Sequence, residues 1–136
     1  MEVLLVNPPS SYLGNPQALP PLGLLYLGAA LERAGHIPTV VDLNLPGADI
    51  RVDGKFGLIG ITCVTANYPV VRSLVDDLRY AYPGVPIVVG GPHVSIVPLD
   101  MIDLGADAAC VGDGEEAIVA LADGRLRAQS VLHYHC

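Results

Sequence analysis

Five short apolar runs alternate with segments of helical periodicity along this chain, and that alternation restricts the possible fold more than any other feature. The runs are apolar almost throughout rather than at every second position, which is typical of strands buried on both faces of a parallel sheet. Helical segments between such strands predict an α/β fold of the flavodoxin-like (Rossmann-like) doubly wound type, with five parallel strands in the order 2-1-3-4-5 and helices on both faces. The predicted strands are residues 2–6, 38–43, 56–62, 86–91 and 106–112.

The predicted helices follow from apolar spacing and from their boundary residues. Pro20 and Pro21 suit a helix start and Gly35 a helix end. The predicted helices are residues 19–35, 66–84, 97–105 and 113–124. The expected buried faces are Leu24, Leu27, Leu31 and Ala34 in the first helix and Val70, Leu74, Leu78 and Ala81 in the second. Residues 1–125 thus form one predicted domain, and 126–136 are an extension that is either an added strand or a frayed end.

Composition excludes several classes of function. The chain has 136 residues, of which 51% are hydrophobic and 15% charged, so it can bury a core without disulfides. Its net charge of −7 argues against a nucleic-acid partner, and no apolar run approaches the ~18–20 residues of a membrane span. The N-terminus lacks the basic segment of a signal peptide. Three widely spaced cysteines without a CxxC pattern favour a reduced, cytoplasmic protein and provide no zinc or iron–sulfur site.

The loops that follow the strands are the candidate binding segments, because ligands of open α/β sheets lie outside the carboxyl ends of the strands. The loop after the first strand is long and carries almost no charge, as expected of a lid or ligand wall. No loop has the GxxxxGK[ST] or GxGxxG pattern of a phosphate site. Residues 112–116 place three carboxylates at a helix start, where they repel phosphate or cap the helix. Asp42, at the end of the second strand, is expected to cap rather than to hold a ribose.

A pair of glycines ends the fourth strand. Gly90 and Gly91 form either a tight turn that needs positive φ or an open seat for something bulky and flat. His93 follows in the same loop, and a lone histidine of this kind is more often structural than a ligand.

Six segments together resemble one family, the N-terminal cobalamin (vitamin B12)-binding domain of cobalamin-dependent radical-SAM enzymes. Each is weak alone, but their order and spacing over about residues 1–125 are fairly specific. The segments are LLVNPP (4–9), PPLGLLYLGAALERAGH (20–36), VVDLN (40–44), LIGITCVTANYP (58–69), VVGGPHVS (88–95) and GDGEEA (112–117).

The resemblance implies a site for cobalamin. The corrin ring would lie over the carboxyl edge of the sheet, its nucleotide tail would pass beside Gly90 and Gly91, and its carboxamides would meet Thr62, Thr65 and Asn67. The implied cofactor-binding residues are Pro8, Pro9, Leu22, Thr62, Val64, Thr65, Asn67, Tyr68, Gly90, Gly91, Pro92, His93, Gly112, Asp113, Gly114 and Glu115. No catalytic residue and no metal ligand is implied. The DxHxxG motif of other cobalamin domains is absent, so we expect base-off cobalamin without a histidine ligand.

The chain also lacks CxxxCxxC, the motif that would hold a radical-SAM cluster. The resemblance therefore implies a binding module that is not catalytic alone and meets a radical-SAM catalytic domain or protein of the methyltransferase or cyclase kind. Two alternatives stay open on the sequence: a stand-alone cobalamin carrier or sensor, and a flavodoxin-like domain that binds another small ligand.

Overall fold

The structure is a computed structural model that describes residues 1–9, 22–62, 68–90, 105–112, 114–124 and 131–134. Its centre is a six-stranded sheet in the order β2-β1-β3-β4-β5-β6, and every neighbouring pair is parallel. The strands are β1 (Glu2–Asn7), β2 (Ile37–Asp42), β3 (Phe56–Thr62), β4 (Ile87–Gly90), β5 (Ala108–Gly112) and β6 (Val131–Tyr134).

The order predicted for the first five strands is confirmed. The sixth strand decides between the two alternatives for the C-terminal segment, because β6 pairs along β5, with Cys110 opposite Leu132. The five strands predicted for residues 1–125 are therefore joined by a sixth from the C-terminal extension.

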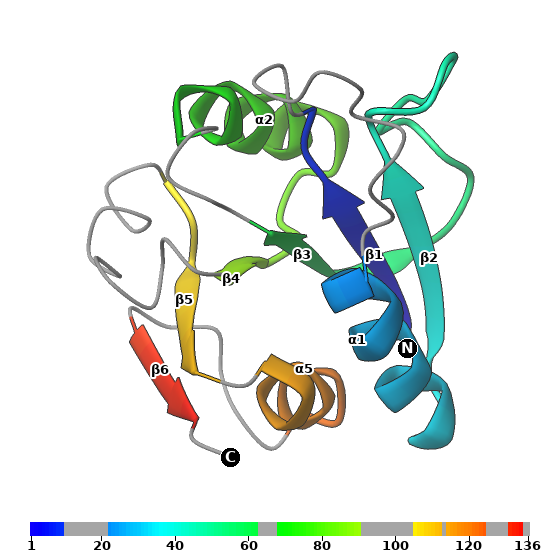
Figure 1. Ribbon diagram of the computed structural model, residues 1–136, viewed down its shortest axis with the longest axis vertical. Helices are drawn as coiled ribbons and strands as arrows, with labels where there is room; N and C mark the ends of the chain where they lie inside the picture. The colour runs from blue at the N-terminus through cyan, green and yellow to red at the C-terminus, as the bar shows by residue number, and fades with distance from the viewer. Residues whose placement is uncertain (10–21, 63–67, 91–104, 113, 125–130, 135–136) are drawn as a thin grey trace.

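In the described part of the chain, three helices cover the two faces of this sheet. Figure 1 shows α2 (Tyr68–Ala81) on one side and α1 (Leu22–Arg33) with α5 (Gly114–Ala122) on the other, as the doubly wound prediction requires. Gly35 takes a positive φ of 89°, which ends α1 in the way its sequence position indicates. The helix predicted for residues 97–105 lies outside the described residues except for Gly105.

Alternate strand residues belong to two separate apolar cores, one on each face of the sheet. Leu4 and Val6 of β1 pack toward α2, whereas Val3 and Leu5 pack toward α1 and α5. Two details of the predicted helix faces were wrong. Ala34 is exposed because α1 has already ended at Arg33. The fully buried face of α2 consists of Val71, Leu74, Val75 and Leu78, with Val70 and Ala81 only partly buried.

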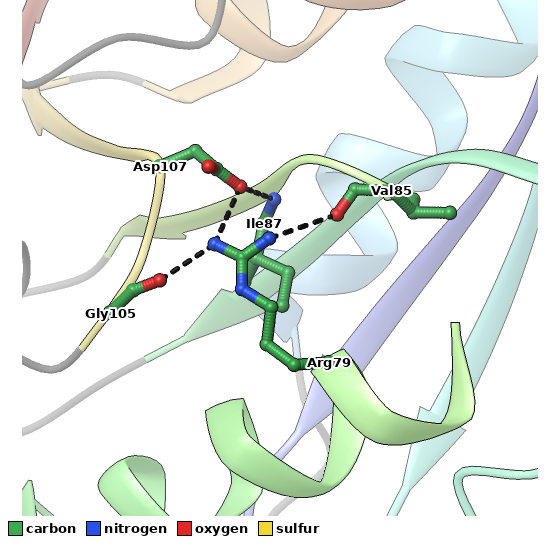
Figure 2. A network of polar contacts seen from close by, with 5 residues as sticks. All are labelled: Arg79, Val85, Ile87, Gly105 and Asp107. Carbon is green, nitrogen blue, oxygen red and sulfur yellow. Dashed lines mark hydrogen bonds and ion pairs between the residues drawn. The ribbon is translucent and has the colours of Figure 1, made fainter. Parts of the chain in front are cut away.

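A polar clamp fixes the start of β4 against the start of β5 (Figure 2). Asp107 Oδ2 accepts hydrogen bonds from Arg79 Nη2 at 2.8 Å and from the Ile87 amide at 2.7 Å. The same guanidinium donates to the carbonyl oxygens of Gly105 and Val85. The clamp therefore joins the end of α2 to both strands and sets the register in which Val88 faces Ala108.

Tyr82 holds the segment between β2 and β3 at two points. Tyr82 Oη donates to the Ile50 carbonyl at 2.6 Å and accepts from the Val52 amide at 3.0 Å. Its ring meets Phe56 edge to face, with centroids 5.6 Å apart. Within the described part of the chain, no helix is both long and apolar enough to span a bilayer.

Candidate functional site

A pocket of about 240 Å³ lies at the carboxyl ends of β3, β4 and β5, between α1 and α5. Its walls are mostly apolar side chains of the two helices, and its floor is the sheet. The lining residues are Gly23, Leu24, Tyr26, Leu27, Gly60, Ile61, Thr62, Val88, Gly90, Cys110, Gly114, Glu115, Ala117, Ile118 and Leu121.

The pocket exists because small residues occupy the strand positions that face α1 and α5. On β3 this face carries Gly60 and Thr62 after Leu58, and on β4 it carries Gly90 after Val88. The register places Thr62 beside Gly90, so the small positions of neighbouring strands coincide. The sheet therefore stops filling the space between the two helices near its carboxyl edge.

Gly90 has no structural reason to be glycine among the described residues. It does not take a positive φ, so the tight-turn alternative does not apply to it. A Cβ atom built at Gly90 would meet only the Cβ of Cys110, at an ordinary 3.8 Å. Gly60 differs, because its added Cβ would lie 3.0 Å from Leu5 Cδ2. Packing thus explains Gly60, whereas the bare backbone at Gly90 mainly leaves the pocket open.

A polar network runs beside the pocket along the carboxyl ends of β3, β1 and β2. Thr62 Oγ1 donates to Asn7 Oδ1 at 3.2 Å, and Asn7 Nδ2 donates to Asp42 Oδ1 at 3.0 Å. Asp42 Oδ1 also accepts from the backbone amide of Asn44 at 3.0 Å and from Asn44 Nδ2 at 2.9 Å. Asn44 Nδ2 in turn reaches the Pro8 carbonyl oxygen at 3.1 Å. The capping role predicted for Asp42 is confirmed, since it caps the turn after β2.

Among the described residues that line the pocket, charge is limited to one side chain. Glu115 is the one charged residue among the described lining residues, and it lies with Glu116 in the first turn of α5. Carboxylates there complement the helix dipole. Among the described residues, no group of three or more His, Cys, Asp or Glu side chains could hold a metal ion.

The structure brings four of the predicted site residues into the pocket wall: Thr62, Gly90, Gly114 and Glu115. Pro8 contributes its carbonyl to the polar network, and Pro9 next to it is exposed. Leu22 and Tyr68 begin α1 and α2, and Gly112 ends β5. The remaining predictions, Val64, Thr65, Asn67, Gly91, Pro92, His93 and Asp113, lie outside the described residues.

The sequence interpretation missed several pocket residues. Gly60 had a signal, since an isolated glycine inside a strand indicates close approach of another group. Helical spacing predicts only a core role for Leu24 and Leu27, although both line the pocket and Leu27 is only partly buried. No sequence signal indicates the role of Asn7, because its partners are 35 and 55 residues away in the chain.

Comparison with known proteins assigns the chain to one family. The family model "B12 binding domain" matches residues 16–122. The chain belongs to the B12-binding domain family. A B12-binding domain has cobalamin as its cofactor, so the sequence-based resemblance is confirmed at this level.

Three curated relatives are similar to this chain over most of its length. The chain is 35% identical to an anaerobic magnesium-protoporphyrin IX monomethyl ester cyclase of Synechocystis sp. over 89% of its length, and 32% identical to a hopanoid C-3 methylase of Methylococcus capsulatus over 85%. It is 33% identical over 92% of its length to an uncharacterized methyltransferase of Pyrococcus horikoshii. The match covers only 27% of the cyclase, 24% of the hopanoid methylase and 30% of the Pyrococcus methyltransferase.

A solved structure supports the fold alone. The N-terminal domain of a hypothetical protein of Thermotoga maritima superposes with a TM-score of 0.54 at 21% identity, covering 82% of this chain and 88% of that one.

Proposed function

We propose that this chain holds cobalamin with the corrin ring over the carboxyl edge of the sheet and the nucleotide tail in the pocket between α1 and α5. The observation that carries the proposal is the bare backbone at Gly90, which neither φ nor packing demands and which keeps the pocket open. A side chain there would occupy the space that a ligand needs.

The size of the pocket supports a ligand that places one part inside the pocket and the rest outside it. Its volume of about 240 Å³ lies just below the ~300–1,000 Å³ of sites that enclose a whole drug-sized molecule. It therefore suits one flat, apolar part of a larger ligand, with the rest lying outside over the sheet edge. The benzimidazole-containing tail of cobalamin is such a part, and Leu24, Leu27 and Ile118 offer it apolar walls.

The polar edge suits the rim of the corrin, whose carboxamides need neutral hydrogen-bonding partners. Thr62 lies at this edge, and Thr65 and Asn67 follow it closely in the sequence.

The loop after β1 contains no histidine. His36 bonds Asp123 at 2.6 Å beyond the end of α1, near Met1 at the opposite edge. We therefore expect base-off cobalamin without a histidine ligand from either segment.

The context we propose is that of a larger enzyme system with a radical-SAM catalytic part. The support is that the relatives named above are a cyclase and methyltransferases, and that the chain spans less than a third of their length. When bound, cobalamin would supply methyl- or electron-transfer chemistry. The residues of this chain would hold it, orient it and exclude water on the tail side. Its three scattered cysteines fit a cytoplasmic setting.

The test is a binding experiment with purified protein and hydroxocobalamin, followed by gel filtration. We expect a coloured complex with close to one cobalamin per chain. Gly90→Leu should abolish binding while the apo protein keeps its melting temperature, because the added side chain fills existing space. Gly28→Ala is the matched control, because its Cβ meets Pro38 at an ordinary 3.8 Å outside the pocket. Colourless wild-type protein refutes the proposal, and normal binding by Gly90→Leu refutes the placement of the tail.

A further inference from the structure

The polar network beside the pocket fixes the direction of its hydrogen bonds. An ionised carboxylate can only accept, so Asp42 Oδ1 requires the Nδ2 side of the Asn7 amide, which donates to it at 3.0 Å. The amide oxygen of Asn7 must then face Thr62. An oxygen of this kind has no proton to give, so the hydroxyl of Thr62 has to donate to it across 3.2 Å.

The consequence concerns the atom that Thr62 shows to the pocket. Its single proton is directed at Asn7, so only its lone pairs remain for another partner, and Thr62 lines the cavity. Among the described residues, the structure records no donor to this oxygen. A ligand atom that contacts the Thr62 hydroxyl therefore contacts a hydrogen-bond acceptor. A ligand donor is attracted there, whereas a second acceptor is repelled.

Building on the proposed function, we infer that Asp42 and Asn7 are positioning residues that make Thr62 select a hydrogen-bond donor of the ligand at the pocket mouth. Cobalamin offers two sources of such a donor, the carboxamide N–H groups of the corrin rim and the ribose hydroxyl of the tail. Neither Asp42 nor Asn7 contacts the ligand in this scheme. They act by holding the hydroxyl of Thr62 in one orientation.

The orientation is tested in the apo protein by nuclear magnetic resonance. The side-chain amide protons of Asn7 should show contacts to Asn44 and none to the γ-methyl group of Thr62. The Thr62 hydroxyl proton should exchange slowly enough to be observed. Contacts from the Asn7 amide protons to the Thr62 methyl would overturn the inference, and this experiment does not depend on any ligand.

The selection is tested by spectrophotometric titration with cobalamin. Thr62→Val should weaken binding about three- to tenfold, the range of one net hydrogen bond, and Thr62→Ser should restore it. Asn7→Leu should weaken binding similarly, but add little in the Thr62→Val background, because both changes remove one function. Wild-type affinity in Thr62→Val, or losses that simply add, would overturn the inference. A purely structural role of Asn7 would lower the melting temperature without this coupling.

Cobinamide, which lacks the nucleotide, separates the two donor sources. A Thr62→Val penalty that persists with cobinamide assigns the donor to a corrin carboxamide, and a penalty seen only with cobalamin assigns it to the tail. If wild-type protein binds neither compound, the proposed function fails, whereas the resonance experiment still decides the orientation of Thr62.

Discussion

Replacing Asp107 by alanine is expected to destabilise the protein more than any ordinary surface substitution. The carboxylate bonds the Ile87 amide at 2.7 Å and Arg79 at 2.8 Å (Figure 2). Ile87 is fully buried, so its amide would lose its partner in a place that water hardly reaches. Arg79 would keep its bonds to the Gly105 and Val85 carbonyls.

The magnitude follows from these two losses. An unsatisfied buried amide costs about 1–3 kcal/mol. The ion pair adds roughly 0–1 kcal/mol, because both side chains are about one third exposed, at 34% and 35%. A total of about 1–4 kcal/mol corresponds to a fall in melting temperature of roughly 4–14 °C for a chain of 136 residues.

Calorimetry on three variants checks this reasoning. Asp107→Asn keeps an acceptor for Ile87 and loses only charge, so it should cost about 1 kcal/mol or less. Asp76→Ala removes the same charge from an exposed site on α2 and should change stability little. Equal losses in Asp107→Ala and Asp107→Asn, or no difference between Asp107→Ala and Asp76→Ala, would show that the amide of Ile87 does not depend on this carboxylate.

Three further outcomes are expected. Gly28→Ala should stabilise the protein by about 0.5–1 kcal/mol in urea unfolding, because glycine disfavours a helix interior and the new methyl group would meet Pro38 at an ordinary 3.8 Å; a loss of stability would contradict this fit. Tyr82→Phe should cost about 1–3 kcal/mol in the same assay, because the Val52 amide and the Ile50 carbonyl lose their partner; an unchanged midpoint would contradict this. Glu115→Gln should raise cobalamin affinity about two- to fivefold at low salt and less at high salt, because it removes the repulsion between the Glu115 carboxylate and the phosphodiester of the tail. Weaker binding of the variant at low salt would count against the placement of the tail.

Much of the fold is local enough to be predicted. The bounds of β3 match the sequence run, and the order of the first five strands follows from alternating strands and helices. The four residues of β6, VLHY, end in a histidine and a tyrosine, so they lack the continuous apolar run that indicates the other strands. Ala34 was misplaced because helical spacing continues through it while the backbone already leaves the helix.

The site was predictable only where topology alone decides it. The fold class predicts a ligand site at the carboxyl edge of the sheet, and Thr62, Gly90 and Glu115 do line a pocket there. The orientation of Thr62 depends on Asn7, 55 residues away, and the floor at Gly60 depends on the pairing of β3 with β1 and β4. Such cross-strand relations require the register, which the sequence does not state.

The central claim is that the tail of cobalamin fills the pocket between α1 and α5. Cys110 lines this pocket, so the rate at which a small alkylating reagent modifies it reports directly on occupancy, in a variant with Cys63→Ser and Cys136→Ser. With cobalamin at about ten times its dissociation constant, the rate should fall roughly tenfold, because only unoccupied protein reacts, whereas cobinamide should protect far less. An alkylation rate that saturating cobalamin leaves unchanged would contradict the claim.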